Sequence, residues 1–193
     1  GLDKYLTHAE RFADGTRRLF DGLAPDYQAR LDEVFKRIAG GREVSIPRFT
    51  DGRPYASSTV RVLPPGGQIG SHCGNEASTR PAYTHLNTLV DRTDQISFFL
   101  TMQAPDAGGE LVVYSLTWND IDEAHIMNGR SRVDDLLPKA RWEAYAPRAG
   151  DLLIFDGGRY FHRVSVVRGN VTRLTIGGFL MISRDGRSVH YWS

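Results

Sequence analysis

The chain has 193 residues, with 24 lysines and arginines against 23 aspartates and glutamates, so its formal net charge is +1. This length suits one domain with a substantial core. The near-neutral charge, with both signs scattered, argues against binding of nucleic acid or of a charged membrane surface.

Targeting and redox signals are few. No apolar run approaches the roughly 20 residues of a membrane span, and no signal peptide opens the chain. The single cysteine, Cys73, excludes an internal disulfide and suits a cytoplasmic protein. The abrupt start at Gly1 leaves room for a missing upstream segment, and the oligomeric state stays open.

Residues 1–42 are expected to form a helical support. Apolar residues recur at intervals of three or four over 4–23 and again over 27–38, on either side of Ala24-Pro25. The second run ends at Gly40-Gly41, a typical helix stop. We expect both helices to brace one outer face of a sheet.

From residue 43 onward the pattern changes to short strands separated by Gly, Pro, Asn and Asp turns. The expected strands are 44–46, 57–63, 68–72, 83–90, 95–103, 109–115, 144–147, 151–155, 162–167 and 171–182. In the second of these, residues 59–62 alternate polar with apolar, as in a half-buried strand. The sequence predicts a mainly β, jelly-roll core over 43–193, in one domain of residues 1–193. An insertion near 118–142 is either a lid or a surface excursion.

Two histidines on separate strands are candidate metal ligands. Iron that activates oxygen takes nitrogen and oxygen ligands on one face of an octahedron. Because residues two apart on a strand point to the same side, a carboxylate two places after a ligating histidine can share its metal. His72 is followed two places on by Gly74, which offers no ligand atom, and His162 follows the turn at 156–158.

Other polar residues are candidates for ligand binding. Arg173 and Thr175, two apart on one expected strand, could together hold a distal carboxylate, with Arg168 as the substitute cation. His85 and Asn87, also two apart on an expected strand, either contact a cosubstrate or water or are ordinary polar lining.

These stretches resemble the iron(II)- and 2-oxoglutarate-dependent oxygenases, whose pattern is His-X-Asp/Glu, a distal His and a later Arg, often as Arg-X-Ser/Thr. The resemblance covers roughly residues 55–182. It implies a double-stranded β-helix (a cupin-like jelly roll) with Fe(II), 2-oxoglutarate as cosubstrate and O2. The matching pieces are His72-Cys73-Gly74, Gly108-Gly109-Glu110-Leu111, Gly150–Phe155, His162-Arg163-Val164 and Arg173-Leu174-Thr175.

Gly74 departs from that pattern in the way of the superfamily's radical halogenases, in which chloride takes the vacant coordination position. Chloride carries the same charge as the lost carboxylate, and glycine leaves room for it. The resemblance thus implies chlorination of an unactivated carbon in a small molecule such as an amino acid or nucleotide.

Three alternatives stay open. The aspartyl/asparaginyl β-hydroxylases also resemble this chain, with His-X-Gly and a later His-Leu, here His85-Leu86, and they hydroxylate with two protein ligands. Glu76 could bend back to bind iron through a turn at Gly74-Asn75. A non-catalytic jelly-roll binding module is the third, against which Arg173-Leu174-Thr175 argues.

The remaining candidates line the expected site. Asn75 and Glu76 either orient a halide, water or substrate amine or form a simple turn. Arg61 lies among apolar neighbours, and an inward arginine needs an anion, so it either binds an anionic group of the substrate or faces outward. Trp118 either lines the mouth as a substrate contact or packs in the core. Cys73 is expected to alternate away from the metal into the core.

Overall fold

The computed structural model describes residues 2–77, 80, 83–127 and 130–193. The chain divides into two compact units, each described here by itself. The first comprises Gly1–Thr59, Ala82–Asp91 and Gly177–Ser193, and the second Val60–Pro81 and Arg92–Ile176. The expectation of a single domain stays a prediction. In the described part of the chain, no helix combines the length and the apolar character that crossing a membrane requires.

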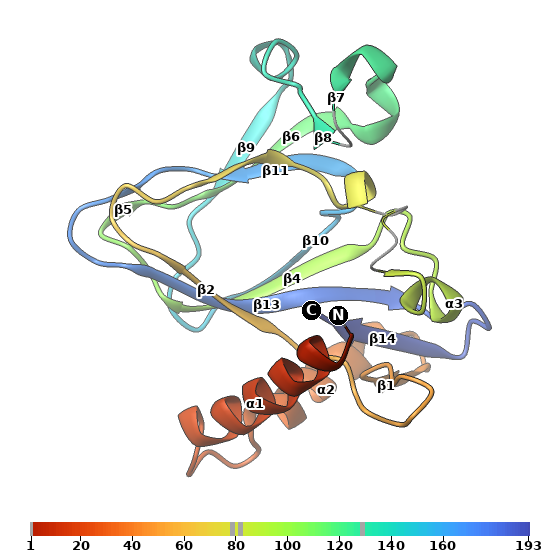
Figure 1. The fold of residues 1–193 in the computed structure, drawn as a ribbon. Helices are drawn as coiled ribbons and strands as arrows, with labels where there is room; N and C mark the ends of the chain where they lie inside the picture. The colour runs from red at the N-terminus through yellow and green to blue at the C-terminus, as the bar shows by residue number, and fades with distance from the viewer. Residues whose placement is uncertain (1, 78–79, 81–82, 128–129) are drawn as a thin grey trace. The chain divides into compact units, whose positions relative to one another are not determined.

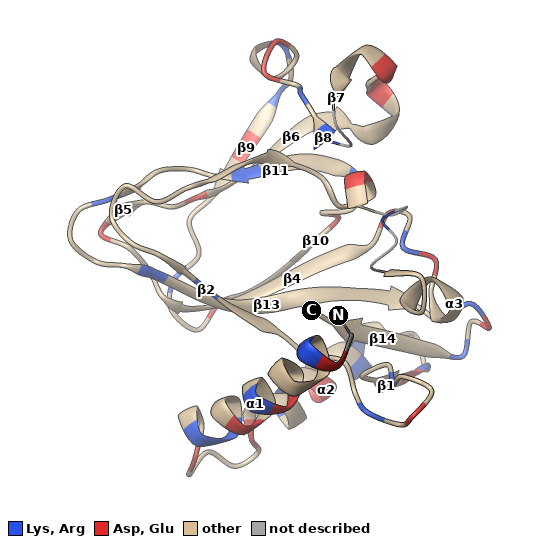
Figure 2. Cartoon of the chain, viewed as in Figure 1, with Lys and Arg blue, Asp and Glu red and all other residues tan. Residues whose placement is uncertain are grey.

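The first unit contains the N-terminal helices and the C-terminal strand (Figure 1). β1 runs parallel to β14, and β14 pairs antiparallel with the later part of β13. Charged residues of both signs are spread along α1 (Figure 2). The elements are α1 (Leu2–Leu19), α2 (Tyr27–Ile38), β1 (Glu43–Ser45), α3 (Leu86–Leu89), β13 (Arg173–Ile182, shared with the second unit) and β14 (Ser188–Trp192).

Both predicted helices are confirmed, and α2 shows why its sequence folds as it does. The Asp26 side chain accepts a hydrogen bond of 2.8 Å from the Ala29 N–H and so caps the first turn. On the inner face, Phe35 is fully buried, with its ring 5.1 Å from that of Tyr191. The Tyr191 hydroxyl donates to Asp32 Oδ1 at 2.7 Å. These contacts attach α2 to β14, a strand that the sequence analysis did not predict.

The strand expected over 83–90 is wrong. Residues Leu86–Leu89 form the short helix α3, and the Val90 N–H donates to the Leu86 carbonyl at 3.0 Å. Leu86 and Val90, both with no exposed surface, lie four residues apart, which is a helical interval that the strand assignment overlooked. His85 and Asn87 therefore do not point to one side as they would on a strand.

The second unit carries two sheets that lie one above the other in Figure 1. One has the order β3-β11-β6-β9; in the other, β4 lies between β10 and β13, and β2 also pairs with β13. The strands are β2 (Thr59–Leu63), β3 (Ile69–His72), β4 (Ile96–Gln103), β5 (Ala107–Gly108), β6 (Leu111–Thr117), β7 (Ile126–Met127), β8 (Arg130–Ser131), β9 (Trp142–Tyr145), β10 (Leu152–Phe155), β11 (Tyr160–Val164) and β12 (Val167–Arg168), with the 3-10 helices η1 (Gly74–Ala77), η3 (Trp118–Asp120), η4 (Glu123–His125) and η5 (Leu137–Lys139).

The register of β11 separates a histidine face from an apolar face. His162 lies opposite His72 on β3 and opposite Val113 on β6. Phe161, which precedes His162, and Cys73, which follows His72, are 0% and 3% exposed. Both belong to an apolar cluster on the other face of the sheet. Cys73 is therefore in the core, as alternation predicts, and burial raises the pKa of its thiol to about 11.

The insertion near 118–142 packs on this apolar face. Val133 is 2% exposed and contacts the cluster of Cys73 and Phe161, and Ile121 and Leu136 pack against the same cluster. The described part of the insertion thus covers the side of the sheet opposite to the histidines. These residues of the insertion therefore pack in the core, and they do not cover the face of the sheet that carries the histidines.

β2 is less buried than expected. Val60 and Val62 are 38% and 58% exposed, so the alternation of residues 59–62 does not produce a buried apolar face. The half-buried strand predicted there is wrong, because neither valine has a packed layer over it.

We expect Phe35→Ala to lower the free energy of unfolding by about 3–5 kcal/mol, because it removes a fully buried ring from the α2 contact. The matched control is Ile38→Ala on the same helix, whose side chain is 56% exposed and should change the stability by less than about 0.5 kcal/mol. Urea denaturation followed by circular dichroism measures both. Equal losses in the two variants would contradict this packing.

Candidate metal centre

His72 and His162 present adjacent imidazoles from paired strands. Their ring centroids are 4.3 Å apart, with an angle of 53° between the ring planes. Nδ1 of His72 lies 2.8 Å from the Gly70 carbonyl oxygen, and Nδ1 of His162 lies 3.0 Å from that of Tyr160. Because a carbonyl oxygen only accepts, both Nδ1 atoms carry the proton and both Nε2 atoms keep a lone pair for a metal.

Both imidazoles are neutral at physiological pH. Burial, followed by the neighbouring His72, lowers the pKa of His162 to about 3. Burial is also the largest cause of the lowered pKa of His72, and the Arg61 charge lowers it further. Neutral imidazole is the form that binds a metal ion, so no proton has to leave these rings when a metal binds.

Gly74 does not lie on the strand that ends at His72. It begins the 3-10 helix η1, and its N–H donates to the Gly157 carbonyl at 2.8 Å. A Cβ added at Gly74 would lie 3.0 Å from Gln95 Nε2 and 3.0 Å from Gly158 Cα. The strand geometry used to relate His72 to Gly74 was therefore wrong, and the position of Gly74 is set by this turn.

Glu76 has both carboxylate oxygens occupied. Oε2 accepts from the Ser131 hydroxyl at 2.7 Å, and Oε1 accepts from Arg80 at 3.2 Å. Across the residues that the structure describes, no three His, Cys, Asp or Glu side chains gather as a metal site. The described donor set at His72 and His162 is thus two imidazole nitrogens, with Glu76 turned to other partners.

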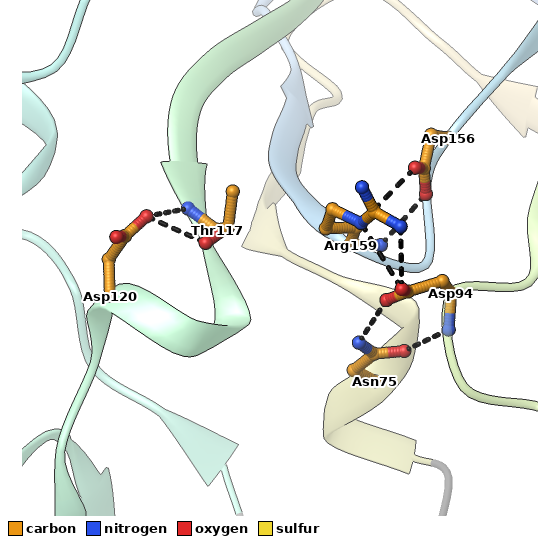
Figure 3. A network of polar contacts seen from close by, with 6 residues as sticks. All are labelled: Asn75, Asp94, Thr117, Asp120, Asp156 and Arg159. Atoms are coloured by element: carbon orange, nitrogen blue, oxygen red, sulfur yellow. Dashed lines mark hydrogen bonds and ion pairs between the residues drawn. The ribbon is translucent and has the colours of Figure 1, made fainter.

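Hydrogen bonds and ion pairs link Asn75, the residue after Gly74, to Asp94, Arg159 and Asp156 (Figure 3). Asn75 Nδ2 donates to Asp94 Oδ1, and the Asp94 N–H donates to Asn75 Oδ1, both at 2.8 Å. Arg159 donates to Asp94 Oδ2 from Nη2 at 2.8 Å and lies 3.6 Å from Asp156. Asp94 has a positive φ of 58°, which asparagine and aspartate tolerate better than other residues. The Asn75 amide, predicted to orient a ligand, is bonded to this network.

Arg173 is a buried cation that two phenylalanine rings link to His162. It is 3% exposed, its Nη1 donates to Thr175 Oγ1 at 3.4 Å, and its guanidinium lies 5.2 Å from the centroid of Phe99. Burial, and secondarily the Arg61 charge, lowers its pKa to about 10. No ion pair joins it to a carboxylate of the described residues. A buried guanidinium of this kind favours an anion supplied from outside the chain.

Two aromatic rings connect Arg173 to the histidines. Phe99 is edge-on to Phe155 at 6.3 Å, and Phe155 is edge-on to His162 at 5.0 Å. The sequence analysis did not single out either phenylalanine. Gly109 was quoted only as part of a motif, yet its φ is +69° and a Cβ there would lie 3.0 Å from Arg173 Cδ. Strand alternation from Arg173 or His162 gives no signal for partners on other strands.

The remaining predicted residues lie elsewhere or have other contacts. Arg61 is a largely exposed residue of β2 in the second unit, but burial lowers the pKa of its guanidinium and its charge lowers the pKa of both histidines. Trp118 packs against the apolar cluster of Cys73. His85 belongs to the first unit, where Nδ1 bonds to the Tyr55 hydroxyl at 2.9 Å and the ring stacks on Phe49 at 4.8 Å. A role for His85 or Asn87 toward a cosubstrate stays a prediction.

Asp94→Ala should lower the free energy of unfolding by roughly 2–4 kcal/mol, because it loses the bonds to Asn75 and Arg159 and places alanine at a positive φ. Asp94→Asn keeps an acceptor and tolerates the backbone, so we expect a loss of only about 1 kcal/mol. Urea denaturation of both variants tests the network. Equal losses would show that the side chain does not hold these turns.

Comparison with known proteins gives the family. No curated protein matches the chain. Two crystal structures of a novel N-substituted L-amino acid dioxygenase from Burkholderia ambifaria AMMD are similar. One has a TM-score of 0.65 at 21% identity, covering 98% of this chain and 69% of the other. The second, in complex with alpha-KG, has a TM-score of 0.59 at 20% identity, covering 99% and 72%. Their likeness confirms the predicted jelly-roll fold.

The family model described as carrier-protein-independent halogenase WelO5 matches residues 1–193. This match confirms the resemblance drawn from the histidine, glycine and arginine motifs. The chain therefore belongs to the carrier-protein-independent halogenase WelO5 family and is a non-haem iron, 2-oxoglutarate-dependent enzyme.

Proposed function

We propose that this enzyme chlorinates an unactivated carbon of a small molecule, with chloride bound to iron beside Gly74. In the proposed site, Nε2 of His72 and Nε2 of His162 hold Fe(II), and Arg173 with Thr175 holds the distal carboxylate of 2-oxoglutarate. The observation that carries the proposal is the pairing of two neutral imidazoles with a glycine and with no carboxylate of the described residues.

The charges support an external anion. The buried Arg173 and the exposed Arg61 are both cationic, and the Arg61 charge lowers the pKa of His72, His162 and Arg173. An iron(II) ion would add two further positive charges. Because Gly74 supplies no carboxylate, we infer that 2-oxoglutarate and chloride balance this charge.

Each side chain has a defined task in this proposal. Iron(II) with 2-oxoglutarate and oxygen supplies the oxidising power that removes a hydrogen atom from the substrate carbon. The Nδ1 hydrogen bonds to the Gly70 and Tyr160 carbonyls keep both imidazoles oriented. The rings of Phe99 and Phe155 lie one after the other between Arg173 and His162 and would give this part of the site an apolar surface.

The overall reaction balances. The substrate C–H bond, O2, 2-oxoglutarate, chloride and one proton give the C–Cl bond, succinate, CO2 and water. The carbon and 2-oxoglutarate are oxidised and O2 is reduced. We infer that the substrate is an amino acid, a nucleotide or a similar small molecule, and that the accessible Arg61 contacts an anionic group on it.

His72→Ala and His162→Ala should each abolish the visible charge-transfer band that forms when Fe(II) and 2-oxoglutarate are added without oxygen, because each removes one of the two protein ligands. The control is His125→Ala, since His125 bonds to Asp122 on the insertion, on the far face of the sheet. That variant should keep the full band. A full band in either ligand variant would contradict the assignment.

Chloride titration of the oxygen-free complex tests the halide. The wild-type band should shift saturably with chloride, and Gly74→Asp should keep the band but lose the shift because its carboxylate occupies the position. Gly74→Ala is matched to it, adding the same crowded Cβ without a ligand, and should keep a chloride response. A wild-type band that chloride does not move, or an aspartate variant that responds like wild type, would leave hydroxylation as the function.

A further inference from the structure

Gln95 is a buried amide whose orientation is fixed by a neighbouring cation. Only 2% of the residue is exposed, and it is among the largest fully buried side chains of the described chain. Arg92 Nε donates to Gln95 Oε1 at 3.2 Å. Because a guanidinium only donates, the amide atom facing Arg92 is the oxygen, and Nε2 faces the other way.

Nε2 of Gln95 faces Gly74. It lies 3.0 Å from the point that a Cβ on Gly74 would occupy, and Cγ of the same side chain lies 3.3 Å from that point. Nε2 donates no hydrogen bond to the residues that the structure describes. An amide donor this deep in the protein favours an acceptor.

The atoms nearest to this point beside Gly74 come from Gln95 and Gly158. Gly158 Cα lies 3.0 Å from the same point, and a Cβ on Gly158 would lie 2.3 Å from the Gln95 backbone nitrogen. The Gly74 N–H is bonded to Gly157 and the Asn75 N–H to Gly158. The nearest neighbours of this point, two residues along the chain from His72, are therefore a glycine and an amide side chain.

We propose that Gln95 Nε2 donates a hydrogen bond to the chloride that binds beside Gly74, and that Gln95 thereby sets the enzyme's affinity for halide. This inference rests on the proposed function. The Arg92 charge on Oε1 polarises the amide and strengthens Nε2–H as a donor. A carboxylate at position 74 would repel a chloride ion. Here Gly74 leaves that place open, and the neutral N–H of Gln95 attracts the anion instead.

Gln95→Met tests this directly, because it keeps the length of the side chain and removes the N–H donor. We expect the chloride dissociation constant, measured from the band shift of the oxygen-free Fe(II)–2-oxoglutarate complex, to rise roughly ten- to a hundredfold, as expected for a hydrogen bond to an ion. Gln95→Glu should lose the chloride shift, since a carboxylate there repels the anion. Gln28→Met, at an exposed position of α2, is the control and should bind chloride like wild type.

The outcomes separate the two proposals. If wild type shows no chloride shift, the proposed function fails and takes this inference with it. If wild type responds and Gln95→Met binds chloride equally well, Gln95 merely supports the turn and this inference alone is overturned. A reduced Fe(II)–2-oxoglutarate band in Gln95→Met would indicate a disturbed metal site, and Gln95→Leu then provides the second measurement of chloride affinity.

Discussion

The antiparallel pairing of β11 with β3 is the constraint on which the rest of the site depends. It places His162 directly opposite His72, and the neighbouring residues Phe161 and Cys73 point to the other face. A slip of one residue would exchange the two faces. Burying the Phe161 ring contributes roughly 1.5–3 kcal/mol, so the apolar cluster that stabilises this sheet also holds the two imidazoles in place.

Electrostatics then determine what the site accepts. Buried polar groups normally find partners within the protein, yet among the described residues the Arg173 guanidinium contacts the Thr175 hydroxyl and the face of Phe99 without a carboxylate. The Arg61 charge lowers the pKa of both histidines and of Arg173. Two cations beside histidines, with the Glu76 carboxylate bonded to Ser131 and Arg80, are suited to anionic ligands, and 2-oxoglutarate with chloride meets that requirement under the proposed function.

The sequence predicted the parts of the site that follow local rules. The helices and most strand positions could be predicted because periodicity is visible along the chain. Motif order singled out His72, His162 and Arg173, whose roles toward a metal and a cosubstrate stay predictions. Gln95, Phe99 and Phe155 could not be predicted, because they contact segments that are distant in the sequence. The error at 83–90 had another source: Leu86 and Val90 fit helical spacing, but their threonine-rich surroundings favour a strand on composition.

Glycine at position 74 is a packing requirement as well as a missing ligand. A Cβ there would lie 3.0 Å from Gly158 Cα and 3.0 Å from Gln95 Nε2, so one of these neighbours would have to shift to admit it. The turn that carries Gln95 is in turn tied to Asn75 and Arg159 through Asp94. The turns at residues 74–75, 94–95 and 157–159 therefore contact one another beside Gly74. A side chain at position 74 is therefore accommodated only by a small shift of the Gln95 side chain or of Gly158, so a third protein ligand at this position depends on these two neighbours as well as on residue 74.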